Sequence, residues 1–382
     1  MAMHRFRLDR ALSAATYLSL VAACSAATGP KPGDVSGDWK VPGPSSVAPA
    51  FDDSTVFFTT PSRDLVAVRK QDGSIRWRTA TGANPLADET SQALFQENGI
   101  VVYGNFDLFA FDARTGQAKW TVRRPSSTGP GFWTFASANG VLFAGSQAGK
   151  AYAIGLADGS VKWEVNLATD TSITRLWYPV AANGRVFFGL HRSTYPVTGG
   201  MVALDATTGA LLWGREFTPP AFPGGTACSS SMATFGSLVI CGSRDTRVYA
   251  LDQATGAIAW STTRPSFETA SDDGRPTTVV GGVVVVGSFS NATQGIDAAT
   301  GTVLWTKTHQ LGSTLEHLTN DGRFAFCDYG GSGNVAAIEP ATGTFHFVRG
   351  PDNAEVMVSA AVSDGTRMYV AGAKYLWAFR LP

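Results

Sequence analysis

Residues 249–260 read YALDQATGAIAW, and this stretch decides the fold because the chain repeats it. Reduced to A-x-D-x-x-T-G-x-x-x-W, the pattern returns in three close copies and three looser ones. In every copy a glycine lies four positions before an aromatic residue. The seven aromatics are Trp77, Trp120, Trp163, Trp213, Trp260, Trp305 and Phe347. Their spacing of 42 to 50 residues predicts a propeller or another repeat array.

Each copy describes a β-hairpin. The residues before Asp252 alternate in size as in a strand, with Val248 and Ala250 on one face and Tyr249 and Leu251 on the other. Asp252 and Thr255 can bond to nearby backbone amides, and Gly256 can adopt the positive φ that a tight turn needs. A second strand then ends in Trp260, whose large flat ring has to be buried. The repeat therefore predicts the outer two strands of a four-stranded unit.

The two ends of the chain complete each other. The first full unit starts with an expected strand over 46–50, and residues 37–42 before it look like a last strand without partners. Three strands are expected over 356–362, 367–371 and 375–380, and no Thr-Gly-x-x-x-Trp segment follows them. Joining the ends removes the open edges of the sheet. We therefore predict an all-β, eight-bladed β-propeller of four-stranded antiparallel blades, its last blade closed by the N-terminal strand.

Composition sets the broad class. The chain has 382 residues, is 44% hydrophobic and 16% charged, and contains 42 glycines, which suits an all-β protein with many turns. The formal net charge is zero, so no basic excess is present to neutralise phosphates. We expect no nucleic-acid partner.

The first residues look like an export signal. Arg5, Arg7 and Arg10 precede a short apolar run that is too short to span a bilayer. The run ends in LVAAC at Cys24, which resembles the lipobox of bacterial lipoproteins, where the cysteine is acylated. This resemblance implies a signal peptide over 1–23, a flexible tether over 24–34 and lipidation at Cys24. The repeats then place the propeller over 35–382. Ordinary signal cleavage nearby is the alternative.

An exported, lipid-anchored protein would lie on the periplasmic or extracellular side of its membrane. In a cell with two membranes, serine after the lipobox cysteine favours the outer one. We interpret Cys228, Cys241 and Cys327 as small core hydrophobes. A cross-strand disulfide between Cys228 and Cys241 stays open as an alternative, because exported proteins can keep such bonds.

The repeat resembles the tryptophan-docking motif of the pyrroloquinoline-quinone (PQQ) propeller superfamily. Length, lipobox and eight blades together resemble the BamB-type lipoproteins of the outer-membrane β-barrel assembly machinery. The resemblance implies that the indoles dock each blade on the next, with Phe347 making a weaker contact. It also implies an envelope protein as partner, with the barrel-assembly machinery as one candidate. The implied docking residues are Trp39, Trp77, Trp120, Trp163, Trp213, Trp260, Trp305 and Phe347.

Long connections are expected on one face of the ring, in the second-to-third and blade-to-blade loops. Irregular loops on a rigid scaffold commonly carry binding sites, although such loops can also be plain connections. The candidate partner-binding residues in these loops are His191, Arg192, Tyr195, Phe222 and Phe267.

Residues at the start of the innermost strands should line the mouth of the central channel on the same face. Acids, arginines and aromatics are mixed there, which suits a small-molecule pocket or paired charges around a watery funnel. The candidates are Glu89, Trp133, Arg175, Trp177, Arg275, Glu316, His317 and Glu355.

The sequence offers no catalytic constellation. The histidines are scattered through different units without a nucleophile beside them, and we align no calcium–quinone site. We therefore expect a monomeric, non-catalytic scaffold without cofactor, which mediates protein–protein interactions in the cell envelope. The alternative is a PQQ- or small-ligand-binding propeller, or a quinoprotein-type oxidoreductase that uses PQQ with calcium.

Overall fold

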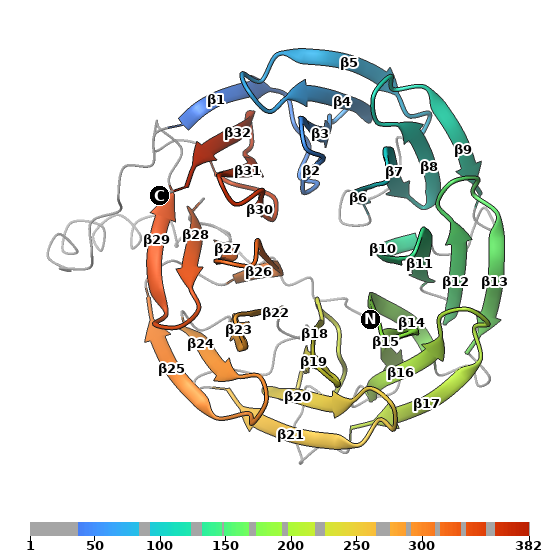
Figure 1. Ribbon diagram of the computed structural model, residues 1–382, viewed down its shortest axis with the longest axis vertical. Helices are drawn as coiled ribbons and strands as arrows, with labels where there is room; N and C mark the ends of the chain where they lie inside the picture. Colours follow the sequence, from blue (N-terminus) through green and yellow to red (C-terminus); the bar gives the residue numbers. More distant parts are fainter. Residues whose placement is uncertain are drawn as a thin grey trace, which may run out of the picture.

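The computed structural model describes residues 37–83, 92–123, 132–146, 149–167, 173–192, 198–217, 226–264, 276–287, 292–309, 314–329, 334–348 and 356–381. Within these ranges the strands form eight four-stranded antiparallel sheets. The sheets stand as blades around a central axis and close into a ring (Figure 1). The predicted eight-bladed β-propeller is confirmed. In the same ranges no helix is long and apolar enough to span a bilayer.

Blades 1 to 4 follow in chain order, each from the axis to the rim. Blade 1 contains β2 (Ala50–Phe51), β3 (Thr55–Thr59), β4 (Asp64–Arg69) and β5 (Ile75–Ala80). Blade 2 contains β6 (Gln92–Glu97), β7 (Ile100–Asn105), β8 (Asp107–Asp112) and β9 (Ala118–Val122). Blade 3 contains β10 (Phe132–Ala138), β11 (Val141–Ser146), β12 (Lys150–Gly155) and β13 (Val161–Asn166). Blade 4 contains β14 (Ile173–Ala182), β15 (Arg185–Arg192), β16 (Gly199–Asp205) and β17 (Leu211–Glu216).

Blades 5 to 8 complete the ring. Blade 5 contains β18 (Ala233–Phe235), β19 (Leu238–Gly242), β20 (Arg247–Asp252) and β21 (Ile258–Thr263). Blade 6 contains β22 (Thr277–Val280), β23 (Val283–Val286), β24 (Ala292–Asp297) and β25 (Val303–Thr308). Blade 7 contains β26 (Thr314–Asn320), β27 (Ala325–Tyr329), β28 (Asn334–Glu339) and β29 (Thr344–Val348). Blade 8 contains β30 (Val362–Ser363), β31 (Arg367–Ala371), β32 (Tyr375–Arg380) and β1 (Gly37–Pro42).

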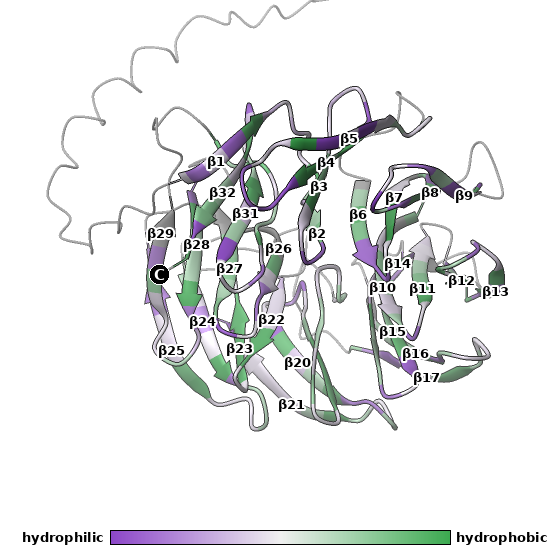
Figure 2. Cartoon of the chain, turned by 45° about the horizontal axis from the view of Figure 1, so that its top comes forward, coloured by the Kyte–Doolittle hydropathy of each residue, from purple (hydrophilic) through white to green (hydrophobic). Residues whose placement is uncertain are grey.

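The core lies between neighbouring blades, on both faces of the second and third strands. All five residues of β3 are buried, whereas the outermost strand β5 is largely exposed. Figure 2 shows this as hydrophobic colour along inner strands such as β23 and hydrophilic colour on outer strands such as β5 and β9. Strands buried on both faces need apolar residues at successive positions rather than at alternate ones. The run TVFFT in β3 meets that need.

The ring is closed by strands from opposite ends of the chain. β1 pairs antiparallel with β32, and Trp39 lies opposite Ala378. The sheet order in blade 8 is therefore β1-β32-β31-β30. Figure 1 shows β1 completing the rim between β29 and β5. Closure covers the edge of β32 that would otherwise expose unpaired backbone groups.

Seven indoles join successive blades. Each indole Nε1 donates a hydrogen bond of 2.7 to 3.1 Å to a backbone carbonyl of the next blade. Each ring also covers the turn glycine of that blade, whose φ lies between 67° and 76°. A Cβ on any of these glycines would lie only 2.7 to 2.8 Å from the indole. The pairs are Trp39 on Gly73, Trp77 on Gly116, Trp120 on Gly159, Trp163 on Gly209, Trp213 on Gly256, Trp260 on Gly301 and Trp305 on Gly343.

A β-bulge places each repeat tryptophan. In blade 5, Leu251 lies opposite Ile258 but Ala250 lies opposite Trp260, so one extra residue stands in the outer strand. A bulge re-aims the side chains that follow it, here onto the face that meets the next blade. The register shift occurs in the outer hairpins of blades 1 to 6. The bulge in the outer hairpin and the contact between blades therefore depend on each other.

Blade 7 lacks this bulge. Ala337 lies opposite His346, and Phe347 lies opposite Ala336. Phe347 is therefore one register position away from the place that tryptophan holds in the other blades. Blade 8 in turn has no third-to-fourth turn, since its third and fourth strands come from opposite ends of the chain. Blade 8 therefore has no third-to-fourth turn glycine to receive an indole from blade 7.

A different indole fills the junction of blades 7 and 8. Trp377 on β32 is 2% exposed and belongs to the same buried cluster as Phe324 and Phe326 of blade 7. It stacks on Phe379 at 5.7 Å between ring centroids. Apolar packing from blade 8 therefore takes the place of the tryptophan dock at this junction.

Two innermost strands are shorter than the sequence predicts. Strands were expected over 46–50 and 356–362, but β2 begins at Ala50 and β30 at Val362. Pro49 has no N–H to donate to a strand ladder. At the other site Ser359 Oγ accepts the Ala371 amide at 3.0 Å, so a side chain replaces a backbone partner. Each of these innermost strands is therefore short because a backbone hydrogen bond of the strand pairing is missing or is replaced by a side chain.

The structure also corrects the interpretation of two cysteines. Cys228 and Cys241 form a disulfide with a Cα–Cα distance of 5.8 Å, so interpreting them as unpaired core residues is wrong. Cys327 is buried with 1% exposure, as expected of a small core residue. The disulfide ties the irregular start of blade 5 to β19.

The docking geometry predicts a large loss of stability for Trp213→Ala. This change removes the hydrogen bond to the Gln253 carbonyl and leaves a void above Gly256. Trp213 is half-buried, so its truncation should lower the free energy of unfolding by about 2–3 kcal/mol, less than that of a fully buried tryptophan, measurable by urea denaturation. Leu211→Ala is the matched control, because this residue of the same strand is 56% exposed and should cost under ~0.5 kcal/mol. Equal losses in the two variants would contradict the docking role.

Candidate functional site

The two faces of the ring differ in their connections. The short-turn face carries the first-to-second turn of every blade and the third-to-fourth turns of blades 1 to 7. Blade 8 has no third-to-fourth turn, because its fourth strand is β1. Backbone hydrogen bonds join the two kinds of turn, such as Ala113 N to Gly99 O and Leu156 N to Gly140 O, both at 2.9 Å. The channel-mouth face is the opposite one, where the innermost strands begin.

A cationic and aromatic cluster lies on the channel-mouth face of blades 4 and 5. We call Arg175, Trp177, His191 and Arg244 the channel-mouth cluster. Trp177 and His191 stack with an interplanar angle of 5° and centroids 5.8 Å apart. The Arg175 guanidinium lies 5.3 Å from the centre of the Trp177 ring. Arg244 Nη1 is 3.2 Å from His191 Nε2, so blade 5 contributes to a site built mainly on blade 4.

Local backbone irregularity presents these side chains. β14 changes register between Trp177 and Val180, and Tyr178 in this bulge has a φ of 44°. The Tyr178 amide donates to Thr134 Oγ1 of blade 3 at 2.9 Å. Strained residues inside bulges are typical of places where a side chain is re-aimed for function. The bulge directly follows Trp177 in the middle of β14.

Close packing fixes the position of Arg244 relative to blade 4. A Cβ on Gly189 would lie 1.8 Å from the Cys228 carbonyl oxygen, so only glycine fits beside the disulfide. The Arg244 amide donates to the Ala227 carbonyl at 3.2 Å. Arg244 itself is only 7% exposed. The disulfide and the close contact at Gly189 therefore hold the backbone near Arg244 in place against blade 4.

Burial and two arginines keep His191 neutral. Burial lowers the pKa of His191 to about 4, and the charges of Arg244 and Arg175 act in the same direction. Near neutral pH the cluster therefore carries the two guanidinium charges over a neutral imidazole and an indole. Guanidinium groups beside aromatic rings suit carboxylate-bearing or acidic groups of a partner.

Several candidates from the sequence are described by the structure. Arg175, Trp177 and His191 come together, although they were assigned to different loops and strand ends. Arg192 is next to them, but its Nη2 pairs with Glu216 Oε1 at 2.6 Å. Trp133 lies on β10, and Glu316 and His317 lie on β26, all three on innermost strands. The candidates outside the described residues are Cys24, Glu89, Tyr195, Phe222, Phe267, Arg275 and Glu355.

The expectation of long second-to-third loops is wrong for several blades. The connection after β3 spans only 60–63, and the one after β19 spans only 243–246. These tight loops contain the positive-φ residues Arg63 and Thr246. Sequence reasoning also missed Arg244, which lies in such a loop. The charged pair after Cys241, Arg244-Asp245, was a usable signal because both residues follow a buried strand.

The described side chains do not fit a calcium–quinone site. Calcium prefers several carboxylate and carbonyl oxygens, whereas the channel-mouth cluster offers two arginines, an indole and an imidazole. In the part of the chain that the structure describes, no three His, Cys, Asp or Glu residues lie together as a metal site would need. We derive no chemistry through such a group.

A family model described as "Outer membrane protein assembly factor BamB" matches residues 19–197 and 197–376. The chain belongs to this family. The predicted resemblance to a PQQ-like propeller close to BamB is thereby confirmed.

Curated relatives carry the same description. The protein named outer membrane protein assembly factor BamB of Bordetella pertussis is 27% identical over 186 residues, or 45% of each chain. The one from Yersinia pestis is 26% identical over 218 residues, 54% of this chain and 51% of the relative. The chain thus spans about half the length of the curated relatives it matches.

Solved structures extend the likeness of fold. BamB from Moraxella catarrhalis has a TM-score of 0.67 at 15% identity, over 91% of this chain and 97% of that one. Quinohemoprotein alcohol dehydrogenase from Comamonas testosteroni has a TM-score of 0.64 at 12% identity, over 90% and 75%. At such identities these likenesses show the shared fold alone.

The depressed pKa of His191 predicts a pH-dependent stability. The unfolded chain binds a proton at His191 near pH 6.5 and the folded chain only near pH 4, so stability falls as the pH drops through that window. We expect His191→Gln to show a shallower fall between pH 6.5 and 4 in urea denaturation. His309, whose pKa burial also lowers to about 4, and carboxyls with a lowered pKa such as Asp364 should account for the fall that remains. Parallel pH profiles for variant and parent would contradict the prediction.

Proposed function

We propose that the chain is an exported, membrane-tethered, non-catalytic propeller that acts as a scaffold in outer-membrane protein assembly. The match of the BamB family model over residues 19–197 and 197–376 carries this proposal. The names of the curated relatives support it. The partner we propose is a protein of the outer-membrane β-barrel assembly machinery. The anchor we propose is a lipid on Cys24.

The position of β1 supports a definite orientation. Gly37 pairs with Phe379 near the end of β32. Two residues later, the Leu381 amide bonds to Thr366 O in a turn of the short-turn face. The chain therefore enters the propeller from that face. The thirteen steps from Cys24 to Gly37 span at most ~45 Å. A chain anchored at Cys24 would keep its channel-mouth face available to a partner.

The chemistry of the channel-mouth cluster supports docking there. Arginine and tryptophan are the residues most enriched in the energetic centres of protein interfaces. Arg175 and Trp177 are half-buried and held by the bulge in β14. A rigid aromatic and cationic surface loses little conformational entropy on binding. We propose that it receives an acidic segment of the partner.

Capture from detergent-solubilised envelopes tests the proposal. The full chain should retrieve a stoichiometric partner from the assembly machinery, and Arg175→Ala with Trp177→Ala should reduce that recovery at least tenfold. Lys119→Ala is the control, because this exposed residue lies on the outer strand β9 and should leave recovery unchanged. Recovery of the bait alone, or equal losses in the cluster and control variants, would overturn the proposal.

The oxidoreductase alternative is checked with the same protein. Addition of PQQ and calcium, followed by an assay of dye-linked alcohol oxidation, would reveal that activity. The scaffold proposal expects neither bound chromophore nor turnover.

A further inference from the structure

A polar groove crosses the junction where the ring closes. It lies on the short-turn face between blades 8 and 1 and has a volume of about 390 Å³. Its walls are the first-to-second turns of both blades and the third-to-fourth turn of blade 1. The charged residues that line it are Asp53, Arg69, Lys70, Arg76, Asp364 and Arg367. Grooves of this volume are within the range that binds small ligands.

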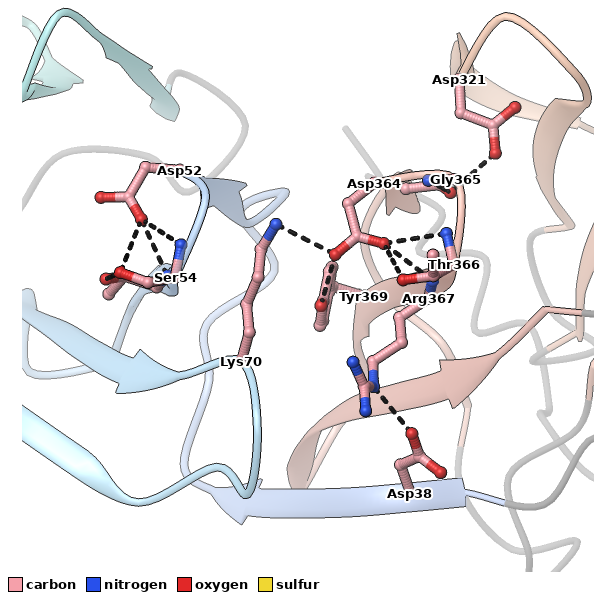
Figure 3. A network of polar contacts seen from close by, with 12 residues as sticks. Asp38, Asp52, Ser54, Lys70, Asp321, Asp364, Gly365, Thr366, Arg367 and Tyr369 are labelled. Atoms are coloured by element: carbon pink, nitrogen blue, oxygen red, sulfur yellow. Dashed lines mark hydrogen bonds and ion pairs between the residues drawn. The ribbon is translucent and has the colours of Figure 1, made fainter.

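Two of the four cations in this groove have carboxylate partners. Lys70 Nζ lies 3.0 Å from Asp364 Oδ2 across the junction, and Arg367 Nε lies 2.7 Å from Asp38 Oδ2 (Figure 3). Burial alone would raise the pKa of Asp364, but hydrogen bonds from Lys70 and from the Arg367 amide outweigh it and hold that pKa far below its usual range. These ion pairs form the base of the groove.

The other two cations bond only to neutral oxygens. Arg69 Nη1 donates to Ser74 Oγ at 2.8 Å, and Arg76 Nη2 donates to the Ser54 carbonyl at 3.4 Å. Neither guanidinium has a carboxylate within ion-pair distance among the described residues. The four cations of the lining are balanced by Asp53 and Asp364 in the lining, by Asp38 beside Arg367 and by Asp72 near Arg69. The feature that favours an anion is therefore this pair of guanidinium groups, without an ion pair in the described part of the chain, and not a net charge.

The sequence of blade 1 departs from the repeat at this groove. Arg69 occupies the place that Asp112, Asp205, Asp252 and Asp297 hold in other blades, as the matching turn hydrogen bonds show. In those blades the aspartate accepts hydrogen bonds from its own turn. Here Asp72 takes over that role by accepting the Ser74 amide at 2.9 Å. The turn is thus preserved, although its first position carries arginine in place of the usual aspartate.

Arg76 is placed by the bulge that serves the tryptophan dock. Ala67 lies opposite Trp77 and Val68 opposite Ile75, so Arg76 is the extra residue of β5. The corresponding position is Lys119 in blade 2, Lys162 in blade 3, Leu212 in blade 4, Ala259 in blade 5 and Leu304 in blade 6. A basic residue at this position is therefore shared with blades 2 and 3. The pairing of Arg76 with a second arginine at the position of Arg69 distinguishes blade 1.

We propose that this groove binds a phosphate group through Arg69 and Arg76. The planar guanidinium presents paired donors that match phosphate oxygens and stays charged at any physiological pH. The phosphate could belong to a lipid headgroup or to a soluble phosphate compound. The lipid source is consistent with the chain entering the propeller on this same face, at Gly37.

Binding here would stabilise ring closure. The ligand would be held by blade 1 across a groove whose other wall belongs to blade 8. A ligand that binds only the folded ring raises the unfolding midpoint by an amount that grows with the logarithm of the ratio of its concentration to its Kd. Thermal unfolding of the full chain in a non-ionic detergent therefore measures the binding.

Arg69→Gln with Arg76→Gln is the decisive variant, since both side chains are exposed and make only the two hydrogen bonds given above. Arg78→Gln is the matched control: it lies on the same strand two residues away, but its Nη2 pairs with Asp64 Oδ2 at 2.5 Å outside the groove. Asp53→Asn removes an exposed negative charge from the lining and should tighten binding. This third variant keeps the test decisive if the double variant does not fold.

Inorganic phosphate is compared with chloride at equal ionic strength, and micelles doped with phosphatidylglycerol are compared with micelles doped with phosphatidylcholine. We expect a raised midpoint in the parent and in Arg78→Gln, at least tenfold weaker binding in the double variant, and severalfold tighter binding in Asp53→Asn.

The pattern of responses identifies the source of the phosphate group. A response to phosphatidylglycerol alone assigns the lipid headgroup, and a response to phosphate assigns a soluble compound. No response in the parent, an equal response in the double variant, or unchanged affinity in Asp53→Asn would overturn the proposal.

Discussion

The propeller depends on one repeated contact, an indole laid over a glycine of the next blade. Two constraints require glycine at this position. Its φ is positive, and the indole ring occupies the space that a Cβ would need. The indole Nε1 meanwhile satisfies a carbonyl at the same turn. Apolar burial, turn geometry and hydrogen bonding thus act at a single point, which is repeated seven times around the ring.

The eighth junction shows why this contact follows the chain topology. A docking glycine needs a third-to-fourth turn, and blade 8 has none because β1 arrives from the other end of the chain. Blade 7 accordingly lacks both the bulge and the tryptophan, with Phe347 opposite Ala336. Trp377 fills the junction from the other side. On its other side, blade 8 is fastened to blade 1 by Trp39 and by the ion pair between Lys70 and Asp364.

The sequence predicted the fold because its signals are local. The turn, the glycine and the tryptophan lie within twelve residues of one another, and the repeat multiplies the signal. The channel-mouth cluster was only partly predictable: Arg175 and Trp177 were expected at a strand end, but their contact with His191 depends on strand register and that with Arg244 on the packing of two blades. The role of Arg69 was not predicted either. The copy of the repeat in blade 1 matches the pattern only loosely, so the sequence alone did not show that arginine stands where other copies have aspartate. The Cys228–Cys241 disulfide stayed an open alternative because Cys228 lies in an irregular segment. No periodic pattern in the sequence predicts the distance between the two cysteines.

The two faces therefore have different chemistry. The channel-mouth face presents an aromatic and cationic cluster, and the short-turn face presents the start of the closing strand and a groove lined by arginines. The closed ring and the groove both require that β1 completes blade 8 in solution. Hydrogen–deuterium exchange of the peptide that covers residues 37–42 tests this most directly. A closed ring predicts protection of these amides comparable to that of β32, whereas exchange as fast as that of an unstructured peptide would contradict it.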